Sequence, residues 1–217
     1  MNPGHAIFSV GAERTGLTGT GGQRPSDPRA AAGLGLWVFM AVAGMLFSLF
    51  LVAYVMRMQS VDWSSMALPW PLWLSTSLLV VASVAMQRAS TAARTGRPAQ
   101  ARRLLLAGGL CALVFLGAQL WAWQLLQDAR VAMAGNPAAS FFYVLTALHG
   151  LHVLGGLIGW GVTLRAVFLS GDTTRQAWRI ALCARYWHFL LVVWLLLFAA
   201  LGWFTPAVVA FICGTTV

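Results

Sequence analysis

The sequence predicts an all-α, polytopic membrane protein, built as a bundle of five transmembrane helices. Of its 217 residues, 59% are hydrophobic and 9% are charged, and the mean hydropathy is +0.77. A soluble domain is about a quarter charged, so a single soluble globular domain is excluded. The long uncharged stretches are 30–56, 63–87, 104–127, 131–164 and 186–217. Crossing about 30 Å of hydrocarbon takes about 20 mostly apolar residues in a helix, whereas barrel strands would alternate, so each stretch predicts one helix.

The first two helices are expected near 33–56 and 69–88, because Arg57 and Arg88 close the corresponding uncharged stretches. The first helix follows residues 1–32, which are rich in Gly, Pro, Ser and Thr. These residues have no apolar run long enough for the core of a signal peptide. We expect them to form a disordered cytoplasmic tail.

The other three helices are bounded in the same way and are expected near 104–126, 139–165 and 184–204. No loop is long enough to hold a soluble domain, and the sequence has no internal repeat. Residues 33–217 are therefore predicted to form one five-helix transmembrane domain.

The arginines predict how the chain is oriented in the membrane. There is no lysine, and all but two of the 14 arginines fall in segments that the predicted spans place on one side. Those arginines are Arg14, Arg24 and Arg29 in the tail, Arg88, Arg94, Arg97, Arg102 and Arg103 around the second loop, and Arg165, Arg175, Arg179 and Arg185 around the fourth. Because basic residues in short loops tend to stay in the cytoplasm, we expect a cytoplasmic amino terminus and a periplasmic carboxyl terminus.

Cysteines and charges exclude several kinds of chemistry. Cys111, Cys183 and Cys213 are scattered, with no pair at metal-ligand spacing, so we expect buried thiols and no metal site. The net charge of +9 would indicate nucleic acid only if the charges shared one accessible surface. They fall instead in separate clusters, so no nucleic-acid partner is expected. No predicted span has Asp, Glu, Lys or Arg in its central part, which argues against an ion pump or a proton-coupled transporter.

Three histidines remain inside the spans: His149 and His152 in the fourth and His188 near the inner end of the fifth. His149 and His152 are three residues apart and share a helical face. Small residues that allow close helix contact follow them: Gly155, Gly156 and Gly159. These histidines could ligate haem or hydrogen-bond to a neighbouring helix or subunit. One haem needs two ligands on facing helices, so helix or subunit packing is favoured.

Two segments carry a resemblance to a known family. Residues 140–156, Ser-Phe-Phe-Tyr-Val-Leu-Thr-Ala-Leu-His-Gly-Leu-His-Val-Leu-Gly-Gly, resemble the fourth-helix signature of subunit III of haem-copper terminal oxidases. In that signature a threonine is followed by H-G-x-H-V and glycines. Residues 186–194, Tyr-Trp-His-Phe-Leu-Leu-Val-Val-Trp, resemble the W-H-F-x-x-x-V-W motif that opens the family's last helix. The packing role is therefore extended to Trp187, next to His188.

Weaker matches extend the resemblance from about residue 33 to 204, and they favour the five-helix bacterial form. They include Gly35-Leu-Trp-Val-Phe in the first helix, Pro71 with Ser75-Thr76 in the second, and Phe115-Leu-Gly-Ala-Gln in the third.

The family's usual carboxylates are missing from this sequence. Ala43 stands where the first helix usually has a buried glutamate, Ala122 where the third helix has a glutamate, and Leu191 where the last motif has an aspartate. The proton-related role linked to the first-helix glutamate is therefore not carried over to this chain.

The resemblance implies an accessory subunit with no catalytic, metal or redox centre of its own. Such a subunit packs on catalytic subunit I, in a complex that also contains subunit II. It holds phospholipid in a cleft between its first two helices and the rest, and it supports oxygen reduction and proton translocation by the complex. Haem and copper would lie in the partner subunits, and the location would be the bacterial inner membrane. Candidate contacts for anionic lipid headgroups are Arg97, Arg102, Arg103 and Arg185, although a topology signal explains these arginines equally well.

Alternative functions stay open at this point. A quinol oxidase subunit III and the accessory membrane protein of nitric oxide reductases share the resemblance, because nothing in subunit III identifies the electron donor. From a different class, an autonomous haem-binding membrane protein predicts a Soret band from the isolated chain. A small transporter predicts solute flux in liposomes that contain only this protein.

Overall fold

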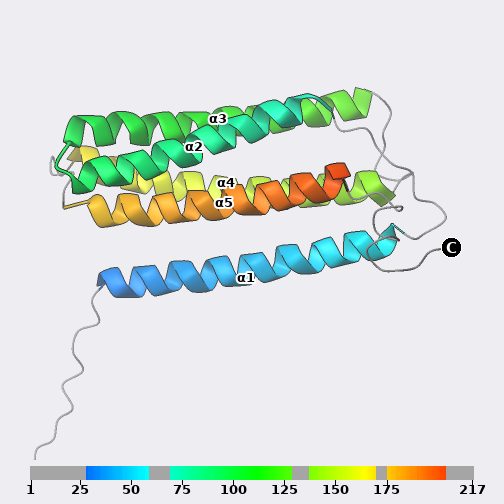
Figure 1. The fold of residues 1–217 in the computed structure, drawn as a ribbon, viewed down its shortest axis with the longest axis horizontal. Helices are drawn as coiled ribbons and strands as arrows, with labels where there is room; N and C mark the ends of the chain where they lie inside the picture. The colour runs from blue at the N-terminus through cyan, green and yellow to red at the C-terminus, as the bar shows by residue number, and fades with distance from the viewer. Residues whose placement is uncertain (1–27, 59–68, 129–136, 170–174, 204–217) are drawn as a thin grey trace, which may run out of the picture.

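A computed structural model describes residues 28–58, 69–128, 137–169 and 175–203. Within them the regular elements are the helices α1 (Pro28–Arg57), α2 (Pro71–Arg94), α3 (Pro98–Asp128), α4 (Pro137–Leu169) and α5 (Ala177–Trp203) (Figure 1). All five are long and apolar enough to cross a membrane. The predicted all-α fold with five membrane-spanning helices is therefore confirmed.

The helices extend beyond the predicted apolar spans. α2 continues past Arg88 to Arg94, and α3 already begins at Pro98. α1 begins at Pro28, so residues 28–32 are helical, whereas we expected them to belong to the tail. Alanine, glutamine and arginine favour helix as strongly as many apolar residues do, so hydropathy marks the part of a helix that crosses lipid and not its ends. The rest of the predicted tail, residues 1–27, lies outside the described residues.

A tight turn joins α2 to α3. Gly96 has a φ of 69°, a left-handed conformation that glycine adopts without steric cost. The backbone N–H of Arg97 donates to the carbonyl oxygen of Ala92 across 2.9 Å, and that of Thr95 donates to Thr91 across 3.0 Å. Together with the glycine, the first bond marks a Schellman cap. Pro98 then opens α3, where its fixed φ and its missing N–H suit the first helical position.

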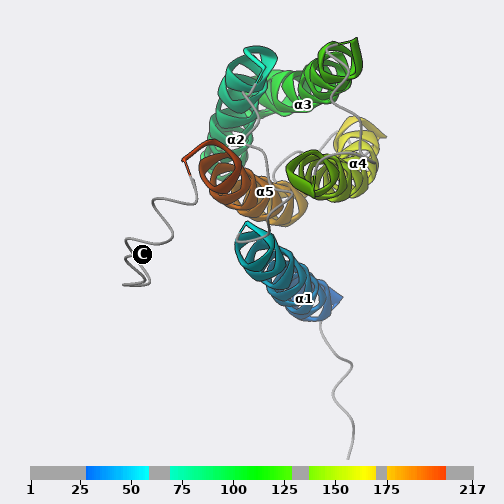
Figure 2. The same cartoon turned by 90° about the vertical axis from the view of Figure 1, so that its right-hand side faces the viewer.

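Four helices form a ring and the first lies outside it. Seen along the bundle, α2, α3, α4 and α5 follow one another around the ring, and α5 closes it against α2 (Figure 2). α1 packs outside the ring, against α5 and α4. The resemblance implied a cleft between the first two helices and the rest. In this structure α2 belongs to the ring, so only α1 stands apart.

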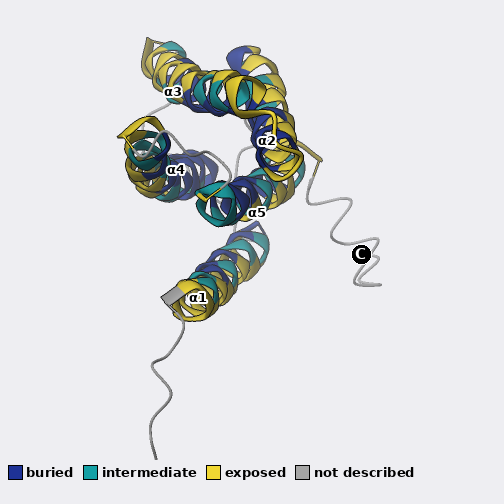
Figure 3. Cartoon of the chain, turned by 90° about the vertical axis from the view of Figure 1, so that its left-hand side faces the viewer, coloured by how far each residue is buried: buried dark blue, intermediate teal, exposed yellow. Residues whose placement is uncertain are grey.

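The core of the molecule lies mainly among the four ring helices, and α1 packs one narrow stripe against them from outside, on α4 and α5. Burial follows the inward side of the ring, while outward faces are exposed (Figure 3). On α1 the buried residues recur at helical spacing: Met40, Ala43, Phe47 and Tyr54. Met58, one residue past the end of the helix, is buried as well. The other faces of α1 expose large apolar side chains, among them Trp37, Val42, Met45 and Met56. α1 therefore presents most of its surface to lipid or to another protein.

Candidate functional site

His149 lies at the centre of the bundle, completely buried. Its ring is surrounded by aromatic rings from three other helices. The ring centroids of Trp194 (α5), Phe115 (α3) and Phe47 (α1) lie 5.1, 5.8 and 6.3 Å from that of His149. Neither ring nitrogen has a hydrogen-bond partner among the described residues. The side chain therefore acts by packing, as the element that α1, α3 and α5 share.

His152 faces α1 and is half-buried. Its Nδ1 lies 2.8 Å from the carbonyl oxygen of Leu148, so Nδ1 carries the proton and donates. Its ring lies 5.2 Å from Phe47 and 5.9 Å from Phe39, both on α1. The hydroxyl of Tyr186 on α5 donates to the backbone oxygen of His152 across 3.0 Å. This turn of α4 therefore joins α1 to α5.

His188 connects α5 to α2. Its Nδ1 lies 2.5 Å from the hydroxyl of Ser83, and its Nε2 lies 3.1 Å from Oε1 of Gln87. The family match in the second helix extended through the run Leu-Leu-Val-Val-Ala-Ser to Ser83, but no motif pointed to Gln87 or paired either residue with His188. A signal was available, because these two polar residues stand four apart in an apolar span and so share a helical face.

Further hydrogen bonds between polar side chains tie the ring together. The indole Nε1–H of Trp194 donates to Thr76 Oγ1 across 2.9 Å, joining α5 to α2. The amide of Gln119 donates to Ser75 Oγ across 3.0 Å, joining α3 to α2. The indole of Trp123 donates to Thr146 Oγ1 across 3.1 Å, joining α3 to α4. The weaker family matches at Ser75-Thr76 and Gln119 therefore mark contacts between helices.

Of the three glycines of α4 that were predicted to pack, one is packed and two are open. A Cβ atom added to Gly156 would lie 2.8 Å from Tyr186 Cε1, so this glycine lets α5 approach closely. Gly155 and Gly159 have no atom within 4 Å of an added Cβ, and both are exposed. Packing through these two, within the chain or against another subunit, stays a prediction.

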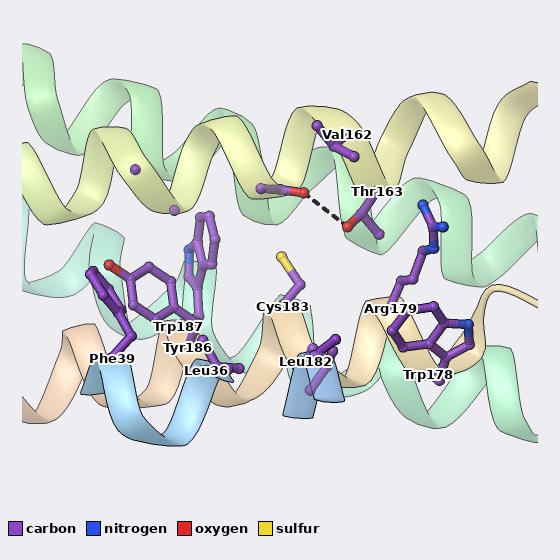
Figure 4. A pocket seen from close by; sticks show the side chains of 14 residues that line it. Leu36, Phe39, Val162, Thr163, Trp178, Arg179, Leu182, Cys183, Tyr186 and Trp187 are labelled. Carbon is purple, nitrogen blue, oxygen red and sulfur yellow. Dashed lines mark hydrogen bonds between the residues drawn. The ribbon is translucent and has the colours of Figure 1, made fainter. Parts of the chain in front are cut away.

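Gly155 and Gly159 line a cavity between α1, α4 and α5, of about 490 Å³. Its walls are mostly apolar, from Leu36 and Phe39 on α1 to Leu182 on α5. Phe39 and Tyr186 lie toward one end, and Trp178 and Arg179 toward the other, with the Arg179 guanidinium 5.2 Å from the Trp178 ring (Figure 4).

Trp187 also lines this cavity and is completely buried. Its indole N–H has no partner among the described residues. Cys183 is buried in the same wall, Cys111 is half-buried in α3, and Cys213 lies outside the described residues.

Among the described residues, the arginines other than Arg57 gather at one end of the bundle. The start of α1, the α2–α3 turn, the end of α4 and the start of α5 all lie at that end (Figure 1), which we call the arginine end. Of the predicted headgroup contacts, Arg97, Arg103 and Arg185 are exposed. Arg102 is half-buried; its Nη2 lies 3.5 Å from the carbonyl oxygen of Val167, and its guanidinium lies 5.4 Å from the Phe168 ring. Arg102 therefore also caps the end of α4.

The positions of the missing carboxylates face inward. Ala43 is 2% exposed and Ala122 is 0% exposed, and Leu191 is half-buried against the core. Asp128, at the opposite end of α3, is the one acidic residue within the described ranges. In the same ranges, no group of three or more His, Cys, Asp or Glu side chains could hold a metal ion.

Comparison with known proteins points to one family. The family described as "Cytochrome c oxidase subunit III" matches residues 32–206, which include nearly all of the five helices. A relative from Nocardia farcinica, named "Probable cytochrome c oxidase subunit 3", is 32% identical over 126 residues, 58% of this chain and 62% of the relative. The same identity and shares are found with the protein of that name from Mycobacterium tuberculosis strain H37Rv. "Cytochrome c oxidase subunit 3" of Branchiostoma lanceolatum is 31% identical over 130 residues, 60% of this chain and 48% of the relative. The matched region thus spans less than two thirds of these relatives.

Proposed function

The chain belongs to the cytochrome c oxidase subunit III family, and we propose on that basis that it serves as an accessory subunit of a respiratory haem-copper oxidase. The observation that carries the proposal is the family match over residues 32–206, which runs through all five helices. The two motifs that suggested the family also meet in the structure. The ring centroid of His149, from the first motif, lies 5.1 Å from that of Trp194, from the second.

In this proposal the chain's contribution is structural. It packs on the catalytic subunit I of an oxidase that also contains subunit II, and those subunits hold the haem and copper. The exposed apolar faces of α1 give it a large surface for such a partner or for lipid, because only 17% of the most apolar stretch of α1 is buried within the chain. The location is the bacterial inner membrane, with the arginine end and the amino terminus on the cytoplasmic side.

The cavity between α1, α4 and α5 is proposed to hold the acyl part of a phospholipid. Its apolar walls suit a hydrocarbon chain, and Arg179 lies toward its arginine end, where a phosphate group would be found (Figure 4). Arg97, Arg102, Arg103 and Arg185 are proposed to contact headgroups at the same level.

Purification of the tagged full chain from its native membranes in a mild detergent tests the proposal. A reduced-minus-oxidised spectrum and mass spectrometry of the co-purifying proteins are the measurements. We expect haem bands and a haem-copper catalytic subunit, and the co-purifying partners together with the haem types distinguish a cytochrome c oxidase from a quinol oxidase or a nitric oxide reductase. A tagged five-span protein of another family is the control. Recovery of the chain without a haem-copper subunit would contradict the proposal.

A further inference from the structure

One face of α1 is packed along most of the helix and open near the arginine end. From Met40 to Tyr54 this face carries buried side chains that pack against α4 and α5. Among residues 29–39 no side chain is buried, although Leu36 and Phe39 continue the same face at helical spacing. Both line the cavity between α1, α4 and α5 (Figure 4). The start of α1 therefore stands away from the ring across that cavity.

Contacts between aromatic rings hold the rest of α1 to the bundle. The ring centroid of Phe47 lies 5.2 Å from that of His152 on α4. The Tyr54 ring meets the Phe141 ring of α4 edge-on, with the centroids 5.7 Å apart. Phe39, at the edge of the cavity, lies 5.9 Å from the ring of His152. The helix is therefore anchored beyond the cavity, and a movement of its start would pivot near Phe47.

The wall opposite Leu36 includes two open glycines. Gly155 and Gly159 of α4 line the cavity, and neither has an atom within 4 Å of an added Cβ. Leu36 lies 18 residues before Tyr54, and Gly159 lies 18 residues after Phe141. Because that separation is about five full helical turns, the Tyr54–Phe141 contact places Leu36 level with Gly159 in these antiparallel helices. Both line the cavity, so they face each other across it.

The start of α1 and an acyl chain can satisfy the same wall of the cavity. The cavity has a volume of about 490 Å³, and the side chains that line such a space gain dispersion contacts only when it is filled or closed. An acyl chain fills it. Movement of α1 onto the glycines closes it, because small residues let two helices approach closely in lipid. Lipid tails are as apolar as leucine, so the two arrangements differ in packing and not in hydrophobic free energy.

We propose that residues 29–39 of α1 form a lid over the cavity. The lid moves about Phe47 between the open position of the structure and a closed position in which Leu36 packs on Gly159. The open lid admits an acyl chain from the surrounding lipid layer, and the bound chain keeps the lid open. This function rests on the phospholipid proposed for the cavity, whereas the movement itself rests on how α1 is packed.

Disulfide cross-linking of the full chain tests the lid. Leu36→Cys and Gly159→Cys are combined in a chain whose native cysteines, Cys111, Cys183 and Cys213, are replaced by alanine. A disulfide joins Cβ atoms about 3.8 Å apart, and no atom lies within 4 Å of an added Cβ at Gly159 in the open position. The bond therefore requires α1 to approach α4. In detergent micelles without phospholipid, with Cu(II)-phenanthroline as the oxidant, we expect this test pair to cross-link.

Leu34→Cys with Gly159→Cys is the matched control. Leu34 is 67% exposed and stands about 200° around the helix from Leu36, so a closing lid keeps it turned away from α4. The control pair should cross-link at least about tenfold more slowly than the test pair, because its Cβ atoms stay too far apart. Equal rates in the two pairs would indicate unwinding or rotation of α1 and would overturn the lid. A test pair that does not cross-link would overturn it as well.

Phosphatidylglycerol added to the micelles tests separately what holds the lid open. At about ten times its dissociation constant, a lipid in the cavity should slow cross-linking of the test pair about tenfold, because only the lipid-free fraction can close. This result would support the movement and the bound lipid together. Cross-linking that the lipid does not slow would support the movement and contradict the phospholipid assigned to the cavity.

Spin labels at exposed positions give a second measurement that leaves the cavity walls unchanged. One pair joins Leu34 in the lid to Leu110 on α3. The other joins Met56, near the opposite end of α1, to Leu120 on α3, and all four side chains are exposed. Double electron–electron resonance should give a broader distribution of distances for the first pair, and phosphatidylglycerol should narrow it. Equal widths for the two pairs would overturn the lid.

Discussion

The indole N–H of Trp160 on α4 donates to the backbone oxygen of Leu105 on α3 across 2.8 Å. This bond lays the ring flat over Gly109, where an added Cβ atom would overlap Cε2 of Trp160. The contact between α3 and α4 therefore depends on a glycine and a tryptophan that no sequence motif connects.

Gly109→Ala is expected to destabilise the bundle by about 1–3 kcal/mol, because the methyl group must push the Trp160 ring away. The measurement is thermal unfolding in detergent, followed by intrinsic fluorescence. Gly117→Ala is the control on the same helix, because no atom lies within 4 Å of an added Cβ at that position. We expect the control to leave stability unchanged or slightly raised, since alanine favours helix. Equal effects in the two variants would show that the ring contact does not hold α3 to α4.

The sequence predicted the fold better than it predicted the contacts. Five helices follow from the spacing of charges, because lipid excludes charge along a whole span. Helix ends such as Arg94 and Pro98 do not follow from hydropathy, since they lie where water again satisfies polar groups. The sequence also could not predict which helices pack against one another. Every face of an apolar helix suits lipid, so the periodicity of apolar residues does not show which face meets a neighbouring helix.

The histidines show both what the sequence could predict and what it could not. The two motifs single out His149, His152 and His188 as candidate packing residues. Their neighbours are far away in the sequence, however: Ser83 is 105 residues from His188, and the aromatic rings around His149 come from three other helices. Only the folded chain brings these groups together.

His188→Leu and His149→Leu are expected to behave differently. His188→Leu removes two bonds between helices and leaves the buried hydroxyl of Ser83 without a partner, so the free energy of unfolding should fall by about 1–3 kcal/mol. His149→Leu removes two buried nitrogens that have no partner among the described residues. Its stability should therefore stay within about 1 kcal/mol of wild type or rise. Chemical unfolding of both variants in detergent checks this. A larger loss of unfolding free energy in His149→Leu than in His188→Leu would contradict the view that His188 joins helices through hydrogen bonds and His149 acts by packing alone.

The Trp194–Thr76 bond is expected to couple α5 to α2 energetically. A double-mutant cycle of Trp194→Phe and Thr76→Val should give a coupling energy of about 0.6 kcal/mol, the size typical of such bonds in membrane proteins. Trp123→Phe with Thr76→Val is the matched control, since Trp123 donates to Thr146 instead. We expect no coupling in the control pair. A test pair with no more coupling than the control pair would show that the bond from Trp194 to Thr76 does not contribute to stability.

The cavity predicts a change in bound lipid. Gly159→Leu places a large side chain in an open wall of the cavity and should lower the amount of phospholipid that co-purifies with the chain, with little change in thermal stability. Gly117→Leu adds the same bulk at an open position on α3 and should retain the lipid. Quantitative lipid analysis of both variants is the measurement. Undiminished lipid in Gly159→Leu would show that the cavity is not where the phospholipid binds.

The intact mass of the assembly that forms around the tagged chain tests the central claim most directly. Native mass spectrometry after mild extraction should show this chain in a complex whose mass includes a haem-copper catalytic subunit with its haem. Dissociation in the gas phase should release this chain without haem. A dominant species made only of this chain, or haem that stays with this chain after dissociation, would contradict the account.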